Sequence, residues 1–257
     1  MTPRTTTPRT STERTASPRT ASRRTLASNL GFLAPVGAVA FTASWIVLSQ
    51  VSDGYQMWDI SVRPYSSVAQ PISGLGLGST APWMNTAFVA CGSLISVGTW
   101  SAMRSWPKKR STLLRWARPM VIGTGLGMAL CGIFDLEAIM LHTLGFVLAA
   151  GVSSIGFSLA GRALRGSSHR ALSAWLQLAG PAGLVGVIAF MMTFDAVDAG
   201  RNVGYAGLVQ RVLVTVVMAL VSAIGLSGRR RTPFSLDERR ERCSTRDNAS
   251  SRTPVGH

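Results

Sequence analysis

Six long apolar segments, separated by shorter polar stretches, dominate the middle of the sequence. They cover residues 30–51, 84–103, 120–140, 141–160, 174–194 and 208–226. At a rise of about 1.5 Å per residue, a helix of about 20 residues crosses the hydrocarbon core of a bilayer. The segments lack the alternation of barrel strands and are apolar on all sides. Because backbone polar groups in lipid need internal partners, the pattern predicts an all-α membrane protein with six transmembrane helices in one bundle.

The third and fourth segments form an almost continuous apolar run that is interrupted by Asp135 and Glu137. A single helix of that length would measure about 60 Å, twice the thickness of the bilayer core. The loops on both sides of the run are rich in Lys and Arg, and loops rich in positive charge lie in the cytoplasm. Two flanks on one side require an even number of crossings. The run is therefore predicted to be a helical hairpin with its turn near residues 135–141.

The positive charges set the predicted orientation. All but three of the 26 Lys and Arg residues fall on one predicted side, and the exceptions are Arg63, Arg201 and Arg211. The positive-inside rule then places both termini in the cytoplasm and the chain in the plasma membrane. We expect the cytoplasmic Lys and Arg side chains to attract anionic lipid headgroups, at about 1 kcal/mol each. Nucleic acid is not an expected partner, because residues 1–29 contain no aromatic side chain for stacking.

The two ends of the chain differ from its middle. Residues 1–29 repeat an Arg-Thr pair every five residues, and residues 229–257 are also basic. Such segments bury too little apolar surface to offset chain entropy, so two disordered tails are predicted around a transmembrane domain at 30–228. The whole chain has only 14% charged residues but a net charge of +15. That uneven distribution excludes an ordinary soluble enzyme.

The longest outer connection, residues 52–83, carries several tyrosines and tryptophans and the Gly-rich stretch 72–79. Tyr and Trp favour the headgroup level of a membrane. Two alternatives remain open for this connection: an ordered cap over the mouth of the bundle, or a flexible loop.

Polar residues at the outer ends of the predicted helices are the candidate functional groups, because ionisable side chains are costly near a membrane interior. The primary candidates are Asp135, Glu137, His142, Gln210 and Arg211, and the secondary candidates are Ser73, Asp195 and Asp198. We expect Arg211 to pair with Asp135 or Asp195 beside His142, as a cluster that binds a small or lipidic ligand or locks the helices together. The alternative interpretation is that the acids only mark helix boundaries and that Arg211 snorkels to the headgroups.

Several chemistries are disfavoured by the residues present. A haem site between helices or a membrane metallohydrolase needs more His ligands than His142 alone supplies. The chain has no P-loop, HExxH or GxSxG motif, and its three cysteines form no CxxC pair. We therefore expect no cofactor, no metal and no catalytic residues, which favours a non-enzymatic protein. A transporter or permease is the alternative, and a lipid-modifying enzyme is a third hypothesis.

Three short patches carry a resemblance to a known family. They are QPISGLGLG at 70–78, with Ser73, Leu75 and Gly76; GIFDLE at 132–137, followed by His142; and GLVQR at 207–211. They resemble the Ser-x-Leu-Gly segment, the Gly-x-Phe-Pro turn with its downstream His, and the Gly-x-x-Gln-Arg start of the last helix in the bacterial and archaeal membrane proteins grouped as domain of unknown function 998.

The resemblance covers residues 30–226 and implies a six-helix membrane bundle, but it implies no activity. Asp135 stands where that family has Pro, and the Trp often present in its last helix is missing. The shared patches coincide with the outer-end polar residues that were selected on physical grounds.

Overall fold

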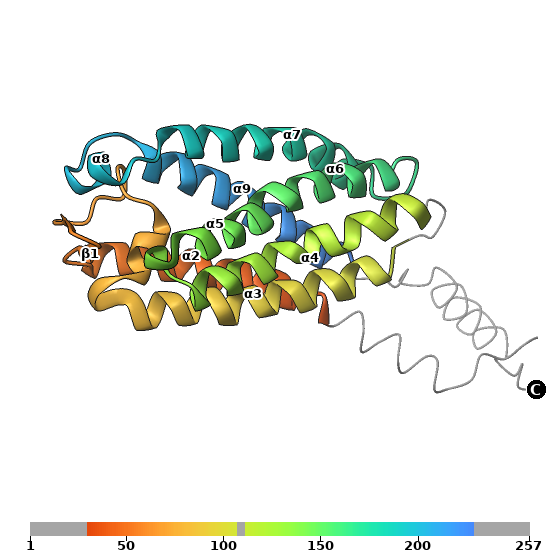
Figure 1. Cartoon of the computed structure of the whole chain (residues 1–257). Coiled ribbons are helices and arrows are strands. Elements are labelled where there is room, and N and C mark those ends of the chain that lie inside the picture. Colours follow the sequence, from red (N-terminus) through yellow and green to blue (C-terminus); the bar gives the residue numbers. More distant parts are fainter. Residues whose placement is uncertain (1–29, 107–110, 229–257) are drawn as a thin grey trace, which may run out of the picture.

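The computed structural model describes residues 30–106 and 111–228 (Figure 1). The two tails predicted at 1–29 and 229–257 lie outside the described residues. Long helices run side by side through the described part. They are α2 Leu33–Val51, α3 Ala81–Arg104, α4 Ser111–Ile133, α7 Arg170–Thr193 and α9 Ala206–Ser227, together with a rod made of α5 Ile139–Phe146, the π-helix η5 Val147–Val152 and α6 Ser153–Ala163.

Five segments are long and apolar enough to cross a membrane: Leu33–Val51, Gly78–Arg104, Leu136–Ala163, Arg170–Thr193 and Ala206–Ser227. The fold is therefore that of an all-α membrane protein, as the hydropathy pattern predicts. The sixth long helix, α4, lies beside the other five but falls outside this group.

The turn between α4 and the rod lies at residues 134–138 and overlaps the turn predicted near residues 135–141. Helix α4 already begins at Ser111 and ends at Ile133, and α5 begins at Ile139, so the boundary predicted between residues 140 and 141 is too late. A short 3-10 turn lies between them, where the Asp135 carboxylate accepts a hydrogen bond from the Glu137 backbone N–H at 3.0 Å. Apolar residues fill the first turn of α5, so hydropathy alone does not mark this boundary.

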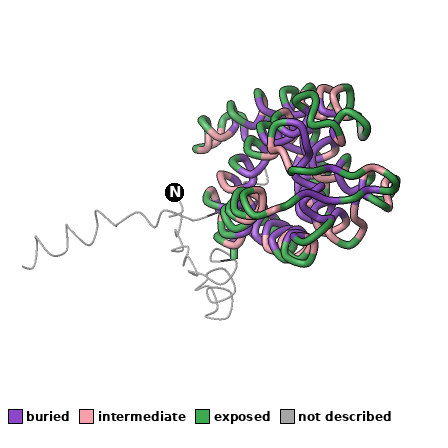
Figure 2. The backbone as a smooth tube through the Cα atoms, turned by 90° about the vertical axis from the view of Figure 1, so that its left-hand side faces the viewer, coloured by how far each residue is buried: buried purple, intermediate pink, exposed green. Residues whose placement is uncertain are grey.

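The buried residues gather on the inner sides of the helices in the view from the end of the bundle (Figure 2), and their apolar side chains form one continuous core. Helix α3 packs between α2 and α4, α6 packs against α4 and α7, and α9 packs against α2, α3 and α7. Glycines make the closest approach possible between α3 and α4, because a Cβ at Gly125 would collide with the carbonyl oxygen of Gly92.

The long connection at residues 52–83 forms an ordered cap, which resolves the two alternatives left open by the sequence. It contains the antiparallel hairpin of β1 Tyr55–Met57 and β2 Ile60–Val62, which the all-α prediction did not include. Two 3-10 turns follow, η1 Ile72–Gly76 and η2 Gly78–Thr80. The short helix α8 Ala196–Gly200 packs against β2 from the α7–α9 connection. A small apolar cluster of its own holds the cap together.

Candidate functional site

Arg211 is buried one turn into α9 and is surrounded by neutral oxygen atoms. Its Nη1 donates hydrogen bonds to the backbone oxygens of Ser67 at 2.6 Å, Gln70 at 2.9 Å and Gly207 at 3.0 Å. Its Nη2 donates to the hydroxyl of Tyr65 at 2.7 Å. The cap segment around residues 65–70 is therefore fastened to α9 by one guanidinium group.

Aromatic faces complete this surrounding. The guanidinium carbon lies 5.4 Å from the ring centroid of Trp45 and 5.9 Å from that of Tyr65, within the range of a cation–π interaction. Among the three guanidinium nitrogens of Arg211, only Nε is buried without a hydrogen-bond partner. We call Arg211 and the groups that it contacts the Arg211 anchor.

Tyr65 couples the anchor to the next part of the cap. Its hydroxyl donates to the backbone oxygen of Pro71 at 3.0 Å while it accepts from Arg211. Burial raises the pKa of Tyr65, and the neighbouring Arg211 charge opposes that rise in part. The phenol therefore stays protonated and keeps both hydrogen bonds well into alkaline conditions.

The predicted pairing of Arg211 with Asp135 or Asp195 is not formed, because both carboxylates are bound locally. Asp135 caps the turn before α5, and Asp195 accepts from the backbone N–H groups of Val197 at 2.7 Å and Asp198 at 3.1 Å. Short acidic side chains compete well for the free N–H groups at such helix starts.

The structure thus divides the candidates into two groups. Glu137, Asp195 and Asp198 are exposed, and Asp135 is half-buried. Ser73, His142, Gln210 and Arg211 are at least nine-tenths buried. The alternative interpretation of the acids as helix-boundary residues therefore describes their positions better than the predicted cluster does.

Gln210 directly precedes Arg211 on α9 but contacts a different part of the cap. Its Oε1 accepts a hydrogen bond from the backbone N–H of Ile72 at 2.6 Å, which fixes the start of η1. That bond identifies the side-chain oxygen as the group facing Ile72, so the amide Nε2 is left for other partners. No hydrogen bond from Nε2 is formed within the described residues.

His142 is held in the first turn of α5. Its Nδ1 lies 2.8 Å from the backbone oxygen of Phe134. A carbonyl oxygen can only accept, so Nδ1 must carry the hydrogen, and in the neutral ring Nε2 is the acceptor. The ring is thereby oriented by the same turn that separates α4 from α5.

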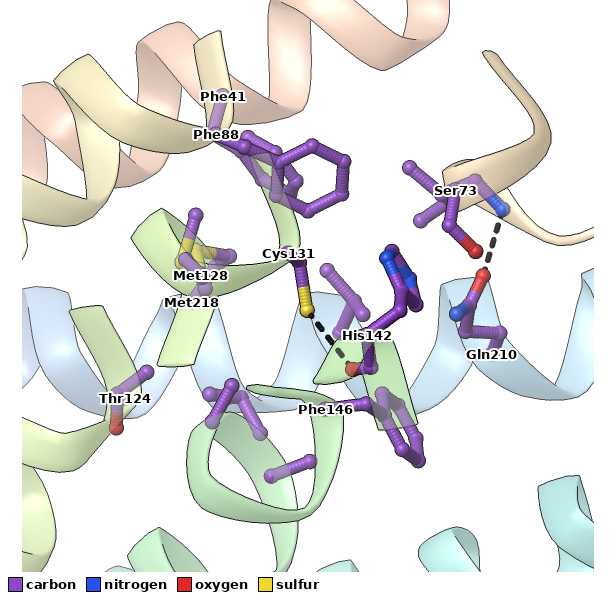
Figure 3. Close-up of a pocket in the computed structure, with 15 residues that line it drawn as sticks. Phe41, Ser73, Phe88, Thr124, Met128, Cys131, His142, Phe146, Gln210 and Met218 are labelled. Carbon is purple, nitrogen blue, oxygen red and sulfur yellow. Dashed lines mark hydrogen bonds between the residues drawn. The ribbon is translucent and has the colours of Figure 1, made fainter. Parts of the chain in front are cut away.

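Two adjoining cavities meet at these side chains (Figure 3). The inner cavity, of about 50 Å³, runs into the bundle, and the outer cavity, of about 170 Å³, lies between α5 and α7. Four residues line both of them: Ser73, His142, Phe146 and Gln210. We call Ser73, His142 and Gln210 the polar junction, because they are the polar side chains where the two cavities meet.

The rest of the inner cavity is apolar except at its far end. Phenylalanine and methionine side chains dominate its wall, and Figure 3 places Thr124 at the end away from the polar junction. The Oγ1 atom of Thr124 is buried without a hydrogen-bond partner. The sequence did not predict this cavity. Ala149 and Ala150 line it from the π-helix η5, and no residue pattern predicts a π-helix.

The described residues contain no group of three or more His, Cys, Asp or Glu side chains that could hold a metal ion. Cys131 lines the inner cavity as a free, buried thiol, with its Sγ 3.5 Å from the backbone oxygen of His142. The site therefore offers hydrogen bonds and apolar surface.

Comparison with known proteins gives one match. No curated protein and no solved structure matched the chain. Residues 35–227, which include nearly all of the helical bundle and the whole cap, match the family described as protein of unknown function DUF998. The sequence resemblance noted from three short patches is thus confirmed over most of the chain, and the protein belongs to the DUF998 family.

Proposed function

We propose that this protein crosses the plasma membrane six times, with both termini in the cytoplasm, and binds a small or lipidic ligand at the outer end of the bundle without catalysing a reaction. The observation that carries the proposal is the pair of adjoining cavities, whose walls are apolar and whose shared polar groups have unused hydrogen-bonding capacity. Small-molecule sites in proteins have this composition.

The distribution of charge supports the proposed orientation. The end of α3, the start of α4, the end of α6 and the start of α7 lie together at the end of the bundle opposite the cap (Figure 1). These ends and the loops between them carry the basic residues of positions 104–118 and 162–170. Basic loops on one end favour the cytoplasm for that end and anionic lipid headgroups as its partners.

The chain's own tail cysteine provides a test of this orientation. Cys91 and Cys131 are buried, whereas Cys243 lies in the C-terminal tail sequence. A membrane-impermeant maleimide should leave Cys243 unlabelled in intact cells and label it after the membrane is permeabilised. Labelling of intact cells, with loss of the signal in Cys243→Ser, would overturn the proposed orientation.

Binding is favoured over the other two functions by the walls of the cavities. A permease requires a water-accessible path from the polar junction to the cytoplasm, but the inner cavity is lined mainly by Phe, Met, Val and Ala side chains. A lipid-modifying enzyme requires an activated nucleophile. No hydrogen bond joins Ser73 to His142, and no Asp or Glu side chain lines either cavity.

Filling the inner cavity tests ligand binding. Ala150→Phe should displace bound lipid from the full-length protein, as measured by native mass spectrometry of protein released from membranes in mild detergent. Ala182→Phe is the matched control, because Ala182 is exposed on α7. Ala150→Leu provides a smaller intrusion if the Phe variant fails to fold. Equal lipid content in the wild type, both Ala150 variants and the control would overturn the proposal.

A further inference from the structure

We infer that the ligand is a neutral single-chain lipid whose polar end carries a carbonyl oxygen and a hydroxyl, a protonated fatty acid or a monoacylglycerol, and that it enters sideways from the bilayer between α5 and α7. This inference rests on the proposed binding function and specifies its ligand and its route.

The polar junction presents a defined set of donors and acceptors. Nδ1 of His142 is occupied by Phe134, so its Nε2 accepts, and Oε1 of Gln210 is occupied by Ile72, so its Nε2 donates. The hydroxyl of Ser73 can do either. A ligand end with one acceptor oxygen and one O–H group satisfies this set. A carboxylic acid or a glycerol ester carries both.

The absence of charge around the junction selects a neutral ligand. Neither cavity is lined by a Lys, Arg, Asp or Glu side chain. The nearest cation along the chain, Arg211, directs its hydrogen bonds into the cap. Placing a phosphate or another permanent charge in such a site carries a large desolvation cost without a compensating partner.

The volumes favour one chain. An apolar cavity of about 150 Å³ holds a molecule the size of benzene. The outer cavity, at about 170 Å³, exceeds this, but the inner cavity, at about 50 Å³, leaves room only for a narrow chain end. The part of the ligand that extends from the polar junction into the inner cavity is therefore a single narrow chain, without a ring or a second chain beside it.

The outer cavity reaches the lipid-facing side of the bundle. Met191 lines it and is also 42% exposed on the surface of α7. Met140 and Met192, which directly follow the lining residues Ile139 and Met191 in the sequence, are each 82% exposed, so both helices present apolar side chains to the surroundings. The α5–α6 rod leans away from α7 toward the capped end, which leaves the two helices apart at that level (Figure 1). The opening therefore faces acyl chains.

The headgroup is tested with four oleoyl probes on the full-length protein in detergent: 1-oleoylglycerol, oleic acid, methyl oleate and oleoyl lysophosphatidic acid. The two uncharged probes with a hydroxyl and a carbonyl, 1-oleoylglycerol and protonated oleic acid, should bind about two- to tenfold more tightly than methyl oleate, the span expected for one hydrogen bond. His142→Ala should abolish that preference. Comparing oleic acid with 1-oleoylglycerol identifies the source. Tightest binding of the phosphate probe would overturn the neutral ligand.

The route is tested by bulk at the opening. In vesicles preloaded with the better oleoyl probe, Met191→Trp should slow binding at least fivefold. Met192→Trp, which lies next to it but outside the cavity lining, should not. Equal rates in both variants would overturn the lateral route. Failure of the headgroup or route arms while Ala150→Phe still displaces lipid refutes only this inference. No lipid bound in any arm refutes the proposed function as well.

Discussion

Gln210 and Arg211 are consecutive on α9 and both are buried, but they belong to two regions that differ in how their polar groups are used. Arg211 has four hydrogen bonds to the cap and its own helix, together with two aromatic faces. Gln210 forms one bond to the cap through its oxygen and faces the cavities with its remaining amide. Burial of an ionisable group in a membrane bundle is therefore not sufficient evidence for a binding site. Unused donors and acceptors beside a cavity are more specific evidence.

Arg211→Ala should cause the largest effect on stability. It removes the donor to the Ser67 and Gln70 oxygens and to Tyr65, and hydrogen bonds from a charged donor contribute about 1.5–3 kcal/mol each. We expect a loss of about 3 kcal/mol or more, measured as a lower melting temperature in detergent, with earlier proteolysis of the cap.

His142→Ala should lower the unfolding free energy by about 1 kcal/mol, because only one neutral hydrogen bond is broken.

Arg211→Lys separates charge from geometry. Lysine keeps the positive charge but lacks the planar fork that reaches the backbone oxygens and Tyr65 together. The stability of Arg211→Lys should lie between that of the wild type and that of Arg211→Ala. If the unfolding free energy of Arg211→Ala lies within about 1 kcal/mol of that of His142→Ala, the distinction between a structural anchor and an open site is wrong.

The helices were predictable because each depends on a local property. About 20 consecutive apolar residues suffice to indicate a spanning helix, and the charged flanks of residues 120–160 indicate a hairpin. The turn was predicted near residues 135–141 and lies at 134–138, but the segment boundary between residues 140 and 141 was too late, because Leu136, Ile139 and Met140 are as apolar as the α4 residues before the turn. The β-hairpin at 55–62 was missed, because three-residue strands leave no recognisable alternation.

The site was predictable residue by residue but not as an assembly. Ser73, His142, Gln210 and Arg211 were each selected from the sequence, and all are buried. Gln210 and Arg211 bind backbone atoms of the cap, such as Ile72 N and Ser67 O, which lie more than a hundred residues away along the chain. Any residue type supplies these atoms, so no sequence pattern marks them. Asp135 was selected by the same reasoning as His142, and only the structure shows that a local N–H group satisfies it.

Alkaline pH should loosen the anchor before it affects the polar junction. Burial holds the pKa of Tyr65 above its ordinary value of 10.0, so the protonated phenol stabilises the folded state below pH 10. That contribution is lost as the pH rises through the raised pKa, when the hydrogen bond to Pro71 can no longer be donated. Melting temperatures should therefore fall above pH 10, and the fall should be smaller in Tyr65→Phe.

Burial also raises the pKa of Tyr55 in the cap, so ionisation of Tyr55 also lowers stability at alkaline pH. Tyr55→Phe is therefore measured beside Tyr65→Phe, which separates the contributions of the two tyrosines. The anchor interpretation requires that Tyr65→Phe lowers stability at neutral pH as well, because it removes the acceptor for Arg211. An unchanged neutral melting temperature in Tyr65→Phe contradicts that interpretation, whatever happens at high pH.

The smallest predicted effect concerns the far end of the inner cavity. Thr124 Oγ1 is buried without a partner, whereas Thr99, also fully buried, donates from Oγ1 to the backbone oxygen of Ile95 at 2.7 Å. Valine has the shape of threonine without the hydroxyl, so Thr124→Val should raise the unfolding free energy by about 1 kcal/mol, and Thr99→Val should leave it equal or lower it. Thermal melting of the delipidated protein measures both. Destabilisation by Thr124→Val would mean that water or a ligand group satisfies this hydroxyl, and the open polar region would then extend from the junction through the whole cavity.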